Sequence, residues 1–148
     1  MPTLNDMLGK SPQRDQVIGD ACEVLDQEVS DKGGISGLAI KAAYGVVKGV
    51  RPGFVREAVD MMLDDFLGAL DPLYQEAVAS NVRPGAHLTK NPARVADALL
   101  GITDRRAEKA ERAVVKGAYE KLRPSAKKHV EAAVPRLGQL LEKHVPRS

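Results

Sequence analysis

The stretch VREAVDMMLDDFLGAL, residues 55–70, decides the fold class because its apolar residues recur every three or four positions. On a helix this spacing gathers them on one face, and it places Glu57, Asp60 and Asp64 on another. The same period of 3.6 residues recurs in every long segment, and none keeps the alternation of a half-buried strand. The sequence therefore predicts an all-α protein, a compact bundle of helices.

Prolines divide the chain into about six principal helices. A residue that precedes proline is disfavoured in helical conformation, so Arg51-Pro52 and Arg123-Pro124 predict breaks. Residues 81–91 are predicted to form a loop, and Pro135 is predicted to kink the last helix because it removes a backbone donor. The predicted helices are 12–30, 35–50, 53–70 (with a short continuation over 72–79 after a bend), 92–102, 104–122 and 124–145.

Four short echoes in the same order suggest that residues 11–70 are repeated in residues 91–146. SPQR at 11–14 resembles NPAR at 91–94, and KAAY at 41–44 resembles KGAY at 116–119. VRP at 50–52 resembles LRP at 122–124, and VREAV at 55–59 resembles VEAAV at 130–134. Helices that begin and end at prolines also repeat such signals by chance. In either case residues 1–148 are expected to form a single helical domain.

Composition excludes several classes of protein. Cys22 is the only cysteine among 148 residues, so neither a disulfide framework nor a thiolate zinc site is expected. Aromatic residues make up 3% of the chain, which disfavours binding of single-stranded nucleic acid, because its bases usually stack on aromatic side chains. The first residues lack the pattern of a signal peptide, and no apolar run approaches the roughly 20 residues of a membrane span. A cytoplasmic location is expected.

The two halves of the chain carry opposite charge. Residues 1–80 hold 7 Lys/Arg and 13 Asp/Glu, whereas residues 81–148 hold 15 and 7. Either the halves neutralise each other in the fold, or one of them offers a basic surface to an anionic partner.

The basic residues of the second half suggest where such a surface would lie. Four cations spaced four, three and four residues apart predict one stripe along the helix expected at 104–122. Three more would extend it around the next turn. A stripe of this kind could follow phosphates or anionic lipid, or it could be an ordinary solvated face. The seven residues are Arg105, Lys109, Arg112, Lys116, Arg123, Lys127 and Lys128.

No catalytic, cofactor-binding or metal site is predicted. Glu57, Asp60, Asp64 and the adjacent Asp65 could hold a hard cation, but an acidic solvent face is the better interpretation, and no Glu-x-x-His pair of a di-iron site occurs. The glycines at 33–37 form neither a phosphate loop nor a dinucleotide fingerprint. The only histidines, His87, His129 and His144, lie outside any nucleophile signature, and Cys22 is expected to act as a small buried hydrophobe.

The predicted helix 35–50 has an apolar arc of about half its circumference, with Lys41 and Lys48 on the remainder. Gly37, Gly45 and Gly49 recur at multiples of four, which permits close helix approach. Such a segment is either the central helix of a bundle or a face that lies on lipid, and the pattern favours central burial.

Several segments together resemble a family of small bacterial proteins that is catalogued as a domain of unknown function. They are DKGGISG at 31–37, KAAY at 41–44, RPGFV at 51–55 and AKKHVEAAVPRLG at 126–138. The resemblance covers nearly the whole chain and implies a bacterial, full-length, single-domain protein. It brings no catalytic residue or cofactor with it.

Three functions remain open. The leading hypothesis is a non-enzymatic protein whose partner is another protein or a second copy of itself. The first alternative is peripheral binding to an anionic membrane through helix 35–50 and the basic second half. The second alternative, which the composition makes weaker, is nucleic-acid binding by the stripe around Arg112.

Overall fold

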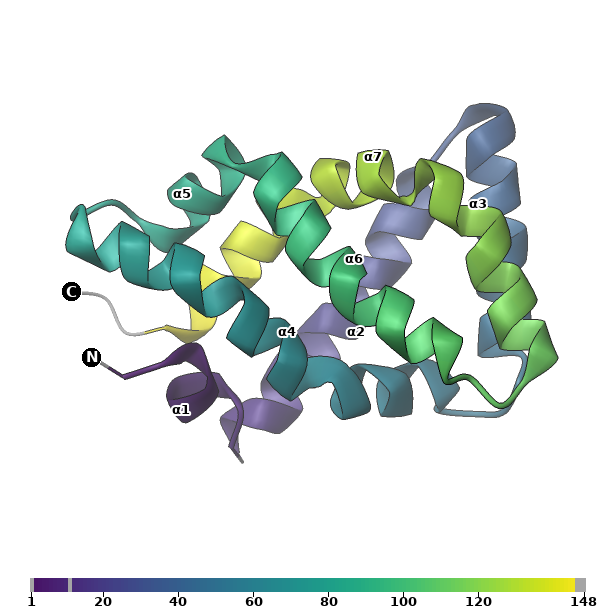
Figure 1. Cartoon of the computed structure of the whole chain (residues 1–148), viewed down its shortest axis with the longest axis horizontal. Helices are drawn as coiled ribbons and strands as arrows, with labels where there is room; N and C mark the ends of the chain where they lie inside the picture. Colours follow the sequence, from purple (N-terminus) through teal and green to yellow (C-terminus); the bar gives the residue numbers. More distant parts are fainter. Residues whose placement is uncertain (1, 11, 146–148) are drawn as a thin grey trace.

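The computed structural model describes residues 2–10 and 12–145. Within these ranges the chain forms seven α-helices and no strand, so the all-α prediction is confirmed (Figure 1). The helices are α1 (Leu4–Leu8), α2 (Gln13–Asp31), α3 (Gly34–Lys48), α4 (Phe54–Ala79), α5 (Pro84–Lys90), α6 (Pro92–Glu108) and α7 (Ala113–His144).

The stretch around residues 55–70 forms most of α4, the helix that contributes the most residues to the core. Its buried side chains follow the helical period along its whole length. The fully buried Leu4 and Leu8 of α1 close one end of this core, and Val134 and Leu141 of α7 close another side. The buried residues of α4 are Val59, Leu63, Leu67, Leu70, Leu73, Tyr74 and Ala77.

The structure corrects two expectations about α4 and the segment after it. α4 is one continuous helix from Phe54 to Ala79 with Pro72 inside it, where a separate short piece over 72–79 was predicted. The buried Leu70 and Leu73 on either side of the proline anchor the helix to the core. Residues 81–91 are not a plain loop, because α5 forms there and buries Leu88 almost completely.

The breaks in the second half also differ from those predicted. α6 continues to Glu108, and the chain turns at residues 109–112 instead of near 103. α7 then runs from Ala113 through both Pro124 and Pro135, so the predicted break at Arg123-Pro124 is wrong. The ion pair between Arg123 and Asp104 of α6, at 2.8 Å, holds this part of α7 against its neighbour. Figure 1 shows α7 changing direction along its course, as prolines within a helix cause.

Candidate interaction surface

α3 leaves its apolar side uncovered, against the expectation of central burial. Ile35 is 89% exposed, Leu38 69% and Val46 47%. Ala39 and Ala42 between them are exposed as well, whereas Ile40 and Ala43 on the opposite side are buried. Small and apolar residues surround most of this helix, so its sequence alone does not say which side faces the core. We call Ile35, Leu38, Ala39, Ala42 and Val46 the α3 face.

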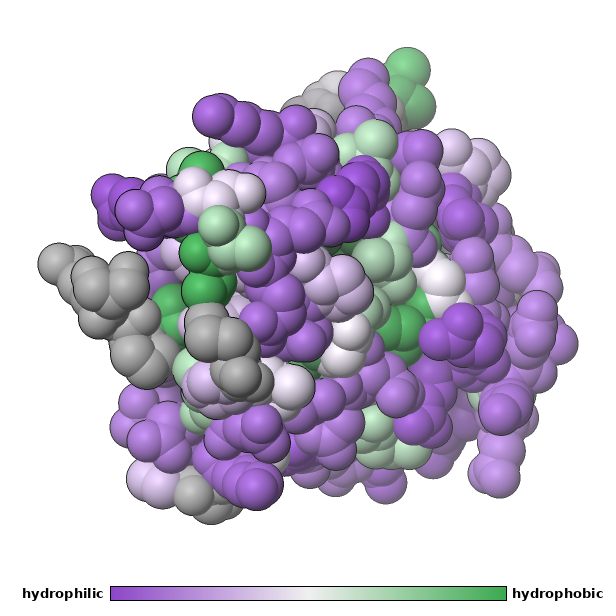
Figure 2. Space-filling view, turned by 60° about the vertical axis from the view of Figure 1, so that its left-hand side comes forward, coloured by the Kyte–Doolittle hydropathy of each residue, from purple (hydrophilic) through white to green (hydrophobic). Residues whose placement is uncertain are grey.

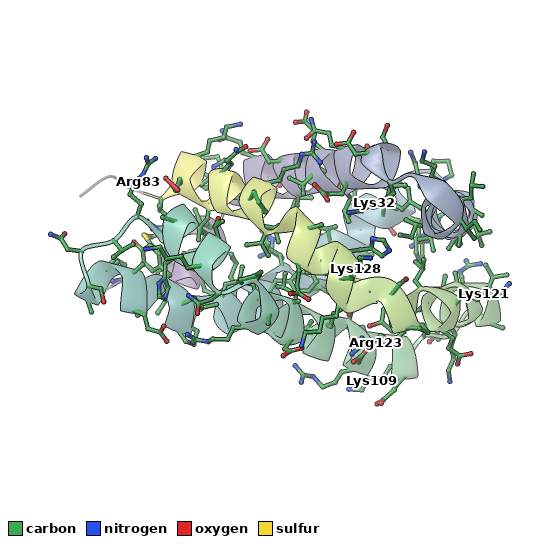
Figure 3. The ribbon with its side chains drawn as sticks, turned by 90° about the horizontal axis from the view of Figure 1, so that it is seen from above. Lys32, Arg83, Lys109, Lys121, Arg123 and Lys128 are labelled. Atoms are coloured by element: carbon green, nitrogen blue, oxygen red, sulfur yellow. The ribbon has the colours of Figure 1, made fainter. Side chains whose placement is uncertain are left out.

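Exposed lysines lie on α3 and on the neighbouring α7. Lys41 and Lys48, seven residues apart, share one side of α3 and are exposed. Lys121 and Lys128 have the same spacing on the neighbouring α7, and Figure 3 shows them along that helix. Val114, seven residues before Lys121, continues their row and is 56% exposed. The exposed apolar residues of α3 therefore share their helix with one row of lysines and lie on a helix that neighbours a second row on α7.

A groove of about 560 Å³ lies where the end of α3 meets the start of α7. Its lining is apolar except for Arg112, the residue before α7, whose side chain does not cap the helix. The groove opens beside Val46 of the α3 face. We call it the α3–α7 groove; its lining residues are Gly45, Val46, Gly49, Val50, Arg112, Ala113 and Val114.

The cations predicted to form one stripe do not share a helix. Arg105 lies on α6, Lys109 and Arg112 in the turn between the helices, and Lys116 on α7. The placement on a single helix face is therefore wrong, because the chain breaks in the middle of the pattern.

Two of the other predicted cations are engaged in ion pairs. Arg123 contacts Asp104 at 2.8 Å, and Lys127 contacts Asp97 at 3.1 Å. Lys128 is exposed, and no ion pair forms with it in the described part of the chain. Whether any of the seven residues contacts a partner stays a prediction.

Much of the charge asymmetry is neutralised inside the fold. Carboxylates of the first half meet Lys, Arg or His side chains of the second half at four places. Glu76 holds His87 and Arg94, Asp65 faces Arg106, Asp20 holds Lys143 and His144, and Arg136 bridges Glu28 and Asp31. The cations left over in the second half lie mostly between residues 105 and 128, and those on α7 belong to the helix that packs against α3.

The acidic residues of α4 face cations of this chain. Arg14 contacts Asp60 at 2.9 Å and Asp64 at 2.8 Å, and Arg51 pairs with Glu57. In the residues that the structure describes, no three His, Cys, Asp or Glu side chains gather as metal ligands would. These carboxylates thus fix the packing of α2 and the 49–53 segment against α4.

The histidines are placed by the same kind of contact. His87 lies 3.0 Å from Glu76, and His144 lies 2.6 Å from Asp20. A hydrogen bond from His144 lowers the pKa of Asp20. His129 differs, because its Nε2 atom is buried and has no partner among the described residues, and burial lowers its pKa. Burial also raises the pKa of the Cys22 thiol, which lies partly covered on α2.

The other end of the molecule has a different surface. Figure 2 shows the end that holds α5 and the chain termini, where hydrophilic side chains dominate and apolar atoms appear only in small separate areas. Across the described ranges, none of the helices has the length and apolar content that crossing a bilayer requires. Four of the six large hydrophobic residues found exposed in the described ranges, Ile35, Leu38, Val46 and Val114, lie on α3 and at the start of α7.

These features define a helical-bundle protein with an exposed apolar face on α3 and exposed lysines on α3 and the neighbouring α7. The chain belongs to a family of unknown function, DUF6918, which matches residues 4–145. No curated protein and no solved structure matches it.

Proposed function

We propose that this protein is a non-catalytic binding protein that attaches to an anionic membrane surface through the α3 face. The exposure of Ile35 and Leu38, 89% and 69%, carries this proposal. Burying a side chain of this size is worth about 1.5–3 kcal/mol, a gain that these residues do not realise in water. An interface with lipid would provide it.

The lysine rows support lipid as the binding partner. A helix that lies in the plane of a membrane joins an apolar face to flanking Lys and Arg, whose stems reach past the apolar layer to the headgroups. Lys41 is exposed on α3 itself, and Lys121 and Lys128 are exposed on α7, which packs against α3. Each such residue contributes about 1 kcal/mol near an anionic surface. Lys48 contributes less, since Asp26 lies 3.6 Å from it.

A protein partner, the leading hypothesis from the sequence, becomes the second candidate. Ala39 and Ala42 on the α3 face would let a partner helix approach closely, which favours it. The lysine rows count against it, because protein interfaces are depleted in Lys and enriched in aromatic residues. Nucleic-acid binding has less support, because its predicted stripe is divided between two helices and a turn.

Sedimentation of the purified protein with vesicles tests the proposal. The probes are vesicles of phosphatidylcholine alone and of phosphatidylcholine mixed with phosphatidylglycerol. We expect binding to the mixed vesicles, weakened roughly tenfold by Leu38→Ser because about 1.4 kcal/mol of apolar burial is lost. Met61→Ser is the matched control, since Met61 is 63% exposed but lies on α4.

Charge variants complete the test. Lys121→Glu with Lys128→Glu should abolish binding, whereas Lys10→Glu with Lys90→Glu changes the net charge equally at exposed positions outside the α3 face and should not. Absence of binding to either kind of vesicle would contradict the proposal and return the protein partner to first place.

A further inference from the structure

We propose that the α3–α7 groove holds one anionic phospholipid of the bilayer, with Arg112 on its phosphate and one of its two acyl chains along Val46, Val50 and Val114. This inference rests on the membrane attachment proposed above and adds a lipid-binding site to it. A protein that only lay on the membrane would need no such site.

The lining of the groove suits an amphiphile. Six of its seven lining residues are valine, alanine or glycine, and Arg112 alone is charged. Ligand sites of this kind combine an apolar wall with a few polar groups that fix orientation. A wall of valines matches an acyl chain, and a single cation at its edge matches a single anionic headgroup.

Gly45 of α3 and Gly49, the residue after that helix, leave the space in which the chain would lie. A Cβ atom added at Gly45 would meet no atom within 4 Å, so that position faces open space. Gly49, one turn later, contributes only backbone to the same wall. A larger side chain at Gly45 would therefore occupy the groove without a clash against the rest of the protein.

Arg112 is available for a phosphate. Its side chain is exposed, and it forms no ion pair within the described ranges. The guanidinium group can donate two parallel hydrogen bonds to a phosphate, which a lysine ammonium cannot. The surroundings are positive as well, because residues 105–128 contain nine Lys/Arg and three Asp/Glu. An anionic headgroup fits this field better than a zwitterionic one.

The position of the groove favours a lipid over a soluble anion. Val46 belongs both to its wall and to the α3 face, so the groove opens where the protein would contact the bilayer. A lipid could enter it without its acyl chain crossing water. A soluble phosphate would gain nothing from the apolar wall.

Two groove variants and two matched controls test the inference by the ratio of affinities for phosphatidylglycerol-containing and pure phosphatidylcholine vesicles. Gly45→Gln fills the groove without adding apolar surface, and Gly101→Gln makes the same change at an open position on α6. Arg112→Lys keeps the charge but removes the two-bond contact, and Arg105→Lys makes the same change at an exposed position outside the groove. We expect each groove variant to lower the ratio roughly fivefold and each control to keep it.

The outcomes separate this inference from the proposal on which it rests. If the groove variants behave as their controls while Leu38→Ser still weakens binding, the membrane attachment stands and the lipid site is wrong. If the wild-type protein binds neither vesicle, both fail. If Gly45→Gln leaves vesicle binding intact but removes a protein cross-linked to the groove, the occupant is a protein and the inference is overturned.

Discussion

Tyr44 and Tyr119, 75 residues apart, make the same contact with the helix that precedes their own. The Tyr44 hydroxyl donates to Asp26 of α2 at 2.6 Å, and the Tyr119 hydroxyl donates to Asp104 of α6 at 2.5 Å. Burial, followed by the adjacent carboxylate, raises the pKa of both phenols, that of Tyr119 to about 12. Each tyrosine thus joins a pair of successive helices in its own half of the chain.

Each of these two carboxylates also contacts a cation, which lies four residues after the tyrosine on the same helix. Lys48 lies 3.6 Å from Asp26, and Arg123 lies 2.8 Å from Asp104, again 75 residues apart. An internal duplication of residues 11–70 in 91–146 predicts contacts of this kind, here with the two acids 78 residues apart and the tyrosines and cations 75 apart. The duplication stays a prediction, and its second copy would contain α6 and the continuous α7 in place of three helices.

Tyr119→Phe should destabilise the protein by about 1 kcal/mol, because it removes a part-buried hydrogen bond to a charged acceptor. Urea unfolding followed by far-UV circular dichroism measures this change. Tyr44→Phe is the comparison: its hydrogen bond is exposed, so the loss should be smaller. Equal stability of Tyr119→Phe and the wild type would mean that Arg123 alone holds Asp104.

Glu76→Gln should make the stability of the protein fall less steeply as the pH is lowered. Hydrogen bonds from Arg94 and then from His87 lower the pKa of Glu76 from 4.5 to about 2. A carboxyl group with a lowered folded-state pKa stabilises the protein above its unfolded pKa, and that stability is lost as the pH falls from about 4.5 towards 2. The variant should be less stable than the wild type at pH 7 and should approach it near pH 2.

Thermal unfolding between pH 2 and pH 7 checks this expectation for Glu76. Glu23→Gln is the control, because Glu23 is an exposed carboxylate of α2 that forms no ion pair in the described part of the chain. A Glu76→Gln profile parallel to that of the wild type would show that the contacts with Arg94 and His87 do not persist in solution.

The helical period predicted much of the fold, but it did not predict where every helix begins and ends. α4 follows its apolar stripe as expected, since a core helix of many turns repeats the signal often. The turn at 109–112 contains neither glycine nor proline, so nothing local marks it, and it arises where Tyr119 and Arg123 bring α7 back onto Asp104. A proline such as Pro124 disfavours a helix locally, and tertiary contacts overcame that preference.

The candidate surface was harder to predict than the fold. The sequence identified α3 as unusually apolar and named Lys41 and Lys48, but periodicity cannot tell a helix that is buried from one that is exposed when both sides are apolar. The groove joins residues 45–50 to 112–114, and such a contact between distant segments leaves no spacing pattern. Arg112 was named for a stripe that the turn divides, and the structure places it on the groove instead.

Leu88→Ala should cost about 2–5 kcal/mol, although it lies in a seven-residue helix that the sequence did not predict. Its side chain is 1% exposed within the main core, so truncation leaves a cavity. Met61→Ala, at a position 63% exposed, should change stability by less than about 0.5 kcal/mol. Urea unfolding of both variants measures the difference. Similar values for the two would show that α5 does not pack on the core.

Replacing two glycines of the second half, Gly85 and Gly101, by alanine should change the stability of the protein in opposite directions. A Cβ atom at Gly85 of α5 would lie 2.9 Å from the carbonyl oxygen of Gly138 in α7, so the two helices would have to separate. Gly85→Ala should therefore destabilise the protein by about 1–3 kcal/mol. A Cβ atom at Gly101 inside α6 meets nothing within 4 Å, and Gly101→Ala should stabilise by about 0.5–1 kcal/mol through helix propensity.

Unfolding of both glycine variants in urea measures the two shifts on one scale. Because Gly85 and Gly138 allow the backbones of α5 and α7 to touch, only the first substitution tests this packing. A gain of stability in Gly85→Ala would mean that α5 and α7 do not pack with the backbones of Gly85 and Gly138 in contact. It would also remove the reason for two glycines at this crossing, since a wider gap would accept a methyl group on either helix.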